Sequence, residues 1–257
     1  MLLAIDIGNT NIHMGLWDQD KWALSWRAQT VPSKMPDEYA VLIHSFLESA
    51  DLRFADVTGL VIGSVVPVLT SAFAELAEKY FHLTPLIVSD KTNTGVRLKV
   101  DNPEQVGPDR IVNTAAVVRL YGAPAIVIDL GTATTFDIVS GDGCYCGGAI
   151  APGIGIASDA LVSRTARLHK VDLVPPPNPI GTNTIHARQS GIFWGYVGLV
   201  EGLVARLKTA MAEPNIKVIA TGGLAPLLNE HTDIIDLIAP ELTLEGLRVI
   251  YDLNHEA

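Results

Sequence analysis

The chain has 257 residues, of which 48% are hydrophobic and 18% charged, a composition typical of a globular protein with a substantial core. The formal net charge of −10 argues against general nucleic-acid binding, because the phosphate backbone requires clustered Lys and Arg. The first residues lack the basic flank of a signal peptide, and the uncharged residues 57–74 contain Gly59, Gly63 and Pro67, which favour a strand, a turn and a helix start over a membrane span. We therefore expect a cytoplasmic protein that binds neither nucleic acid nor membrane.

Hydrophobic periodicity predicts that strands and helices alternate in the first half of the chain. Strands are predicted at residues 2–7, 12–17, 22–28, 60–66 and 86–88, the first two joined by a tight turn. Helices are predicted over residues 39–47 and 69–80, and another follows Asp109 with apolar residues from Ile111 to Leu120. This order indicates an α/β fold.

An internal repeat lies at half the length of the chain. Ala-Ile-Asp-Ile-Gly-Asn-Thr-Asn at residues 4–11 matches Val-Ile-Asp-Leu-Gly-Thr-Ala-Thr at residues 127–134, and the two aspartates are 123 residues apart. Two such copies predict two similar α/β domains. The Gly122-Ala123-Pro124 segment marks the boundary, so the expected domains are residues 1–121 and 122–257.

Each copy of the repeat has the features of a phosphate-binding loop. An Asp at the end of a strand can hold a hydrated cation, and a following Gly lets backbone N–H groups approach phosphate oxygens. The loop residues are Asp6, Gly8, Asn9, Thr10 and Asn11 in the first copy, and Asp129, Gly131, Thr132 and Thr134 in the second. Either copy alone is explained as well by an ordinary hairpin. Two matched copies favour a pair of loops that clamp a triphosphate across a cleft.

The segment Gly107-Pro108-Asp109-Arg110 offers a candidate catalytic group. Asp109 would serve merely as a helix N-cap in the simplest interpretation, because Asp is a common capping residue. In the functional interpretation, Asp109 accepts the proton of a substrate hydroxyl during phosphoryl transfer, and Arg110 binds an anionic group. Two weaker signals are Thr184, a possible hydroxyl contact, and the glycines of Thr221-Gly222-Gly223, against which an adenosine could lie.

Together these segments resemble the type III pantothenate kinases. The resemblance extends over nearly the whole chain and is carried by Asp6–Asn11, Gly107–Arg110, Asp129–Ala133 and Thr221–Gly223 in the order and spacing of that family. Further segments that look like the family are Ser64–Pro67, Gly148–Gly153 and Leu242–Leu247.

The resemblance implies an actin-like ATPase fold of two ribonuclease H-like domains related by duplication, in an enzyme that phosphorylates pantothenate at the start of coenzyme A biosynthesis. It implies ATP with Mg²⁺, a monovalent cation (K⁺ or NH₄⁺) at Asp129, and a homodimer. The implied ATP contacts are Asp6, Ile7, Gly8, Asn9, Thr10, Asn11, Ile12, His13 and Thr132. The implied substrate contacts are Val100, Gly107, Pro108, Asp109, Arg110 and Thr184, with Asp109 as the proton acceptor.

Two positions depart from the family pattern. Val100 stands where many members carry Tyr, and Pro108 stands where Ala or Val is more usual, so both alter the expected pantothenate pocket. A homodimer is also suggested by the apolar helices expected at residues 111–120 and 192–207, which carry no obvious charged shield. The alternatives are another small-molecule kinase of the same superfamily and a non-enzymatic accessory or regulatory homologue; the presence of all three aspartates, Asp6, Asp109 and Asp129, argues against the latter.

Overall fold

The computed structural model describes residues 1–89, 91–164 and 171–255, and the chain divides into two compact units. The first unit comprises Met1–Tyr121 together with the chain from Glu241 onward, and the second comprises Gly122–Pro240. The break before Gly122 is where the sequence places a domain boundary. The expected second domain ran to residue 257, but the structure assigns the last helix to the first unit, because that helix packs on the first sheet.

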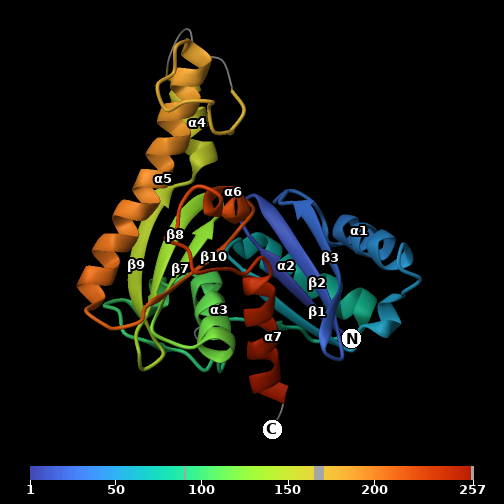
Figure 1. Cartoon of the computed structure of the whole chain (residues 1–257). Helices are drawn as coiled ribbons and strands as arrows, with labels where there is room; N and C mark the ends of the chain where they lie inside the picture. The colour runs from blue at the N-terminus through green and yellow to red at the C-terminus, as the bar shows by residue number, and fades with distance from the viewer. Residues whose placement is uncertain (90, 165–170, 256–257) are drawn as a thin grey trace. The chain divides into compact units, whose positions relative to one another are not determined.

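The first unit is built on a five-stranded sheet in the order β3-β2-β1-β4-β5 (Figure 1). Its strands are β1 (Leu2–Ile7), β2 (Asn11–Asp18), β3 (Lys21–Gln29), β4 (Gly59–Ser64) and β5 (Leu86–Ile87), followed in the chain by the short β6 (Arg97–Leu98). Its helices are α1 (Pro36–Glu48), α2 (Pro67–Leu76), α3 (Pro108–Ala116) and α7 (Leu242–His255). Short helical turns are η1 (Phe54–Asp56), η2 (Ala77–Phe81), η3 (Pro103–Gln105) and η4 (Val117–Tyr121).

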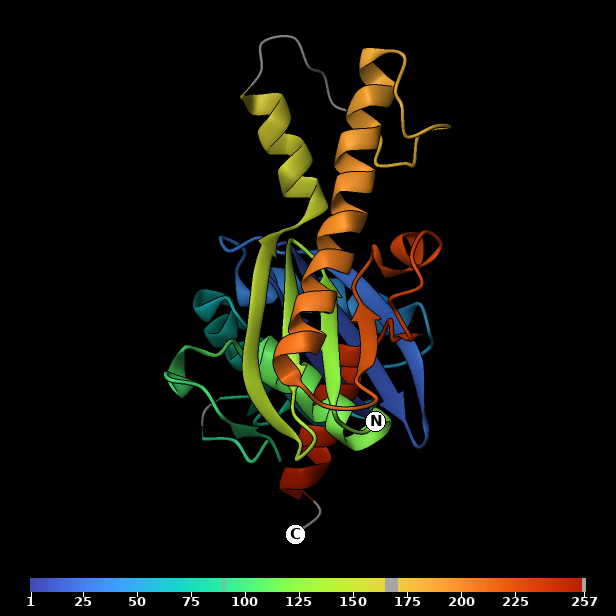
Figure 2. The ribbon, with the colours of Figure 1, turned by 60° about the vertical axis from the view of Figure 1, so that its left-hand side comes forward.

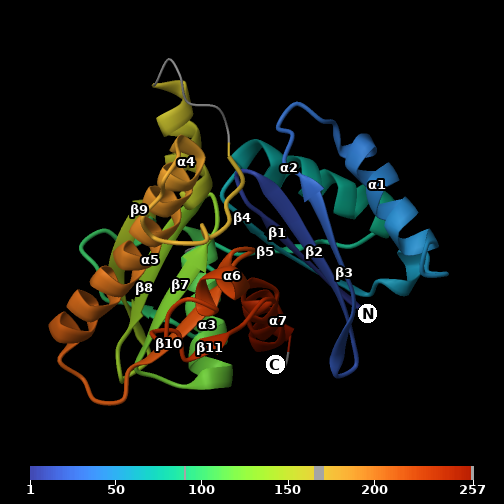
Figure 3. The same ribbon diagram turned by 45° about the horizontal axis from the view of Figure 1, so that its top comes forward.

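Helices cover both faces of this first sheet (Figure 3). The alternate residues Leu3, Ile5 and Ile7 of β1 pack against α1 and α2, whereas Leu2 and Ala4 pack against α3 and α7. Successive side chains of a strand point to opposite faces, so a run as apolar as β1 is expected where both faces are covered.

The second unit repeats the plan of the first. Its strands, β7 (Ala125–Leu130), β8 (Ala133–Val139), β9 (Cys144–Pro152), β10 (Lys217–Thr221) and β11 (Leu237–Ile238), lie in the order β11-β10-β7-β8-β9. Its helices are α4 (Ile154–Ser163), α5 (Thr184–Met211) and the short α6 (Ala225–Asn229). Figure 2 shows α5 lying along one face of the sheet and continuing, beside α4, beyond the strands. In both units a hairpin pairs antiparallel, β1 with β2 and β7 with β8, as the repeat predicts.

The two apolar helices that suggested a dimer are largely buried within their own units. Ile111 and Val112 of α3 lie in the first core, and Tyr196, Val200 and Val204 of α5 lie in the second. Packing inside the chain therefore explains much of their apolar character, and the homodimer stays a prediction. Among the described residues, no helix is long and apolar enough to cross a membrane.

Candidate active site

The first predicted phosphate loop is a tight turn at the end of β1. The Gly8 N–H donates to the Asn11 carbonyl oxygen at 3.0 Å, which leaves the side chains of Asn9, Thr10 and Asn11 exposed. Thr30, just after β3, supports the turn, because its hydroxyl donates to the Gly8 carbonyl at 2.7 Å and its N–H donates to the Thr10 carbonyl at 2.9 Å. The loop is thus held rigidly while its donors face solvent, as an anion site requires.

Asp6 lies beside this turn, half-buried, opposite His13 on β2 and next to Gly63 on β4. The His13 Nε2 atom is 2.9 Å from the Ser25 hydroxyl and 3.1 Å from Glu241 Oε2. Burial, with a contribution from the nearby Arg27 charge, lowers the pKa of His13 to about 4. At neutral pH the imidazole beside the loop is therefore uncharged.

The candidate base Asp109 is not a helix N-cap. Gly107 occupies the N-cap position of α3, Pro108 is the first helical residue and Asp109 the second, and the cap makes no side-chain hydrogen bond. Asp109 is half-buried, with its carboxylate close over Gly107, where a Cβ atom would collide with it. The cap interpretation is therefore wrong, and the carboxylate is left available for another role.

The middle of α3 packs against the first turns of α7. The Thr243 hydroxyl donates to Asn113 Oδ1 at 2.9 Å, and Gly246 packs so closely on the Val112 carbonyl that a Cβ atom there would collide. Glu241, directly before α7, contacts His13. Within the first unit, His13 beside the candidate ATP loop and the helix that follows Gly107 therefore both contact the first part of the chain from Glu241 onward. Val100 is half-buried in the loop between β6 and η3, seven residues before Gly107.

The second predicted phosphate loop is one residue shorter than the first. Residues 131–133 lie between the paired Leu130 and Thr134, whereas residues 8–11 lie between Ile7 and Ile12. The Gly131 N–H donates to the Ala133 carbonyl at 3.1 Å, and the Gly153 N–H donates to the Thr132 carbonyl at 3.2 Å, while the Thr132 side chain stays exposed.

Asp129 is flanked by two threonines on neighbouring strands. It lies opposite Thr135 in the antiparallel ladder with β8 and next to Thr221 in the parallel ladder with β10. Its neighbours Ile128 and Leu130 belong to the core that contains α5, so the Asp129 side chain is on the opposite face of the sheet. Laterally paired residues point to the same face, so a carboxylate and two hydroxyls meet at the carboxyl ends of β7 and β10.

A buried polar network behind Asp129 is not evident from the sequence. Asp137 on β8 is fully buried and accepts hydrogen bonds from the Thr135 hydroxyl at 3.1 Å and the Tyr145 hydroxyl at 3.2 Å. Asp137 shares a face of the sheet with Asp129 only because of the register in which β7 and β8 pair. That register depends on which residues of the two strands pair, which a single sequence does not reveal.

The paired glycines after β10 have different reasons for being glycine. Gly222 has φ of +90°, and a Cβ atom there would lie 2.6 Å from the Leu130 carbonyl oxygen. Glycine is therefore required at this position by the fold itself, without any ligand. A Cβ atom at Gly223 would meet no atom within 4 Å. Of the two, Gly223 alone has an open side that a ligand could approach.

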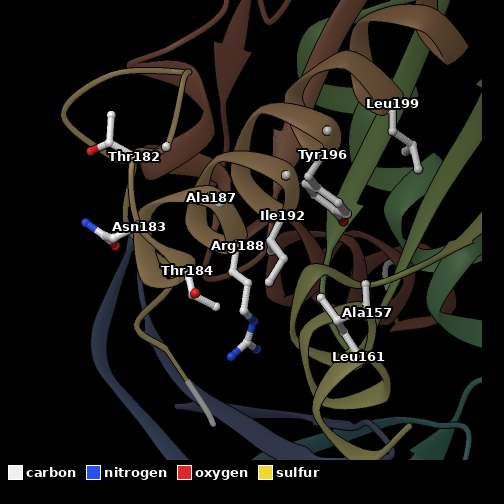
Figure 4. A pocket seen from close by; sticks show the side chains of 13 residues that line it. Ala157, Leu161, Thr182, Asn183, Thr184, Ala187, Arg188, Ile192, Tyr196 and Leu199 are labelled. Carbon is white, nitrogen blue, oxygen red and sulfur yellow. The ribbon is translucent and has the colours of Figure 1, made fainter. Parts of the chain in front are cut away.

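Thr184 lies at a groove of the second unit rather than at its phosphate loop. It begins α5 after the N-cap Asn183, whose side chain accepts the His186 N–H at 2.9 Å. The groove, of about 710 Å³, lies between α4 and the first half of α5, a volume within the range of small-molecule sites. Figure 4 shows the Arg188 guanidinium projecting from α5 into it near Thr184. Arg188 was not singled out from the sequence, because a helical Arg is usually a solvated surface residue.

The structure thus groups the predicted residues within each unit. The first unit holds Asp6–His13 and Gly107–Arg110, and the second holds Asp129, Thr132 and Thr184. Across residues 1–89, 91–164 and 171–255, no group of three or more His, Cys, Asp or Glu side chains could by itself hold a metal ion.

Comparison with known proteins gives matches over the full length. The family model described as type III pantothenate kinase matches residues 2–206. A protein named type III pantothenate kinase from Roseiflexus sp. (strain RS-1) is 49% identical over 254 residues, covering 99% of both chains. Another of that name from Geobacillus kaustophilus is 47% identical over 256 residues, covering 100% of this chain and 99% of the relative.

Solved structures share the fold at low identity. A conserved Baf family protein from Campylobacter jejuni superposes with a TM-score of 0.64 at 20% identity, covering 99% of this chain and 100% of that one. An inorganic polyphosphate/ATP-glucomannokinase from Arthrobacter sp. strain KM gives 0.53 at 16% identity, covering 99% of each chain. The expected actin-like fold of two ribonuclease H-like domains is confirmed.

Proposed function

Because this chain belongs to the type III pantothenate kinase family, we propose that it transfers the γ-phosphoryl group of ATP to the 4′-hydroxyl of pantothenate, the first step of coenzyme A biosynthesis. The observation that carries the proposal is the full-length match to relatives of that name, in a chain that holds an aspartate at each of the three predicted positions.

ATP would be bound by the residues from Asp6 to His13 and by Thr132. The support is local geometry: Thr30 braces the first turn, and Asn9, Thr10 and Asn11 are exposed to solvent, where they can meet phosphate oxygens. Asp6 offers a carboxylate for the divalent ion, because Mg²⁺ is usually held by one or two carboxylates together with substrate phosphates. When bound, Mg²⁺ neutralises charge on those phosphates. The neutral His13 adds no charge that would compete with the ion.

Asp109 would accept the proton of the attacking hydroxyl. Phosphoryl transfer depends mainly on positioning and charge stabilisation, because its transition state is loose. A half-buried carboxylate at the start of a helix is a fixed acceptor that can orient the alcohol. Arg110, next in the chain, would bind the substrate carboxylate. The remaining substrate contacts would be made by Val100, Gly107, Pro108 and Thr184.

Asp129 would hold a monovalent cation. Its surroundings fit such an ion, because Thr135 and Thr221 offer neutral oxygen atoms on the same face and Asp129 supplies a single negative charge. Hard cations without strong geometric demands are bound by carboxylate, hydroxyl and carbonyl oxygens.

We also propose a homodimer, formed through the exposed side of α4 and α5. Gly191, Gly195 and Gly198 lie along α5, and a Cβ atom at each would meet only open space. Exposed apolar side chains accompany them, with Ile156 47% and Ile185 57% exposed. Glycine inside a helix costs about 1 kcal/mol relative to alanine, so three of them on one helix are best explained by close approach of another backbone.

Sedimentation velocity at micromolar concentration tests the homodimer. The wild type should sediment as a dimer, and Gly195→Glu should shift it toward monomer, because Glu is a good helix former but places a charge in the contact. Ala205→Glu, at an exposed position farther along the same helix, should leave the dimer intact. A wild-type monomer would rule out the proposal.

The activity is tested by an ATP-dependent phosphorylation assay with pantothenate and with a panel of other small alcohols, each with and without K⁺. Phosphopantothenate should form, and faster with K⁺ than with Na⁺ alone. Phosphorylation of another alcohol but not of pantothenate would indicate a different kinase of the superfamily. No ATP-dependent product with any substrate would indicate an accessory protein.

A further inference from the structure

A fully buried carboxylate, Asp137 on β8, lies behind the proposed cation site and has no part in the reaction described above. Its Oδ2 accepts a hydrogen bond from Thr135 Oγ1 at 3.1 Å, and its Oδ1 accepts one from the Tyr145 hydroxyl at 3.2 Å. Burying a carboxylate is costly unless hydrogen bonds compensate for lost water. The Thr135 and Tyr145 donors are neutral hydroxyls, and Thr135 leads directly to Asp129.

Thr135 connects Asp137 with Asp129. Thr135 and Asp129 are directly opposite each other in the β7–β8 ladder. Such pairs share a face of the sheet with their Cβ atoms about 4.5–5.5 Å apart, close enough for one ion to touch oxygens of both. Both residues are half-buried, so an ion from solvent can reach them, whereas Asp137 lies deeper on the same face.

The direction of the hydrogen bond decides what Thr135 can offer. A threonine hydroxyl has one proton to donate and two lone pairs that accept. Because the proton is donated to Asp137, the lone pairs are left for a partner on the Asp129 side. A cation needs such an oxygen, and a hydroxyl whose proton turned toward Asp129 would repel it.

We propose that Asp137 is a positioning residue that fixes the Thr135 hydroxyl as an oxygen ligand of the monovalent cation held by Asp129. This inference rests on the proposed function of Asp129. The hydroxyl adds an oxygen ligand to the cation without itself adding charge. Loss of a partner that orients a metal ligand typically lowers metal affinity by about 10–100-fold, which sets the expected scale.

Substitutions of Thr135 and Asp137 test the proposal with two readouts. Thr135→Val removes the hydroxyl at nearly constant shape, and Asp137→Asn lets an amide N–H take the lone pairs of Thr135. Each should raise the K⁺ concentration that gives half-maximal activity by about 10-fold or more, with kcat at saturating K⁺ changed far less. Each should also reduce the rise in melting temperature that KCl gives over choline chloride at equal concentration. Thr135→Ser should keep both properties.

Tyr145→Phe is the matched control, because it removes the hydrogen bond from Tyr145 to Asp137 and leaves Thr135 untouched. It should lower the melting temperature without changing the K⁺ requirement. If Thr135→Val binds K⁺ like the wild type by both readouts, the inference is wrong. The comparison of Val with Ser at position 135 decides the matter even if Asp137→Asn does not fold. A wild type that responds equally to K⁺ and Na⁺ would instead overturn the proposed cation function, and this inference with it.

Discussion

Replacing Asp109 by Asn separates a catalytic carboxylate from a merely structural one. Asp109 is the second residue of α3 behind the N-cap Gly107, so its contribution to stability is the attraction between its charge and the helix N-terminus. That attraction is worth about 0.3–1 kcal/mol at such sites. A change of about 1 kcal/mol shifts the melting temperature of a protein of this size by about 2–4 °C. Asp109→Asn should therefore cost a few degrees at most.

The effect on rate should be far larger. A positioned general base typically contributes about 10²–10⁴-fold, and Asn keeps the size of Asp while losing its charge and most of its basicity. We expect kcat for pantothenate phosphorylation to fall by about 100-fold or more, with the KM for ATP little changed. The assay is steady-state kinetics together with a melting curve on the same preparation.

The chain contains a matched control for this experiment. Asp37 has the same position in α1, directly after Pro36, that Asp109 has in α3 after Pro108. The Asp37 carboxylate also accepts hydrogen bonds from Lys79 and Tyr80, which lower its pKa, so Asp37→Asn should lose at least as much stability. Its kcat should stay near that of the wild type. A near-normal kcat in Asp109→Asn would remove Asp109 from the mechanism.

Two further predictions concern packing and pH. Gly246→Ala places a Cβ atom against the Val112 carbonyl and should destabilise the protein by about 1–3 kcal/mol. The control is Gly155→Ala in α4, where a Cβ atom meets only open space, and it should be neutral or stabilising. Equal melting temperatures of the two variants would contradict the contact between Gly246 and Val112. The pKa of His13 is about 4 in the folded protein and 6.5 in the unfolded chain. Between pH 4 and pH 6.5 the unfolded chain therefore binds more protons than the folded protein. The stability that is present above pH 6.5 is lost as the pH falls toward 4. The melting temperature should therefore drop less between pH 7 and pH 5 in His13→Asn than in the wild type. An equal drop in both proteins would count against the burial of a neutral imidazole facing Asp6, Arg27 and Glu241.

Much of the fold follows from patterns that are local in the sequence. The strand predicted at residues 60–66 is β4, and the helix predicted over residues 69–80 is α2 with the turn that continues it. The repeat correctly indicates two units, because each copy contains a whole hairpin. The last helix illustrates what local patterns cannot settle. Leu244, Leu247 and Ile250 mark an amphipathic helix, but nothing in them says which of two similar sheets they cover.

The residues of the candidate site likewise fall into those that the sequence predicts and those that it does not. Loop residues such as Gly8 and Asn9 are recognisable because turn chemistry restricts residue type over a few positions. Asp137 and Arg188 were missed because their roles depend on neighbours that are distant in the chain or on another strand. The capping interpretation of Asp109 differs from the observed N-cap, Gly107, by two residues, since Gly, Pro and Asp are all common at helix starts and only the backbone geometry decides among them.

The two copies of the repeat keep their aspartate but surround it differently. Asp6 lies between His13, an uncharged ring, and Gly63, a residue without a side chain that packs on Leu247 of α7. Asp129 lies between Thr135 and Thr221, which place neutral hydroxyl oxygen atoms on the same face of the sheet. The first turn is also one residue longer and exposes more donors. Under the proposed roles, the same strand–Asp–turn scaffold would serve phosphate contacts in one unit and a cation site in the other. The two proposed roles therefore differ through the residues at the flanking strand positions, which are His13 and Gly63 in one copy and Thr135 and Thr221 in the other.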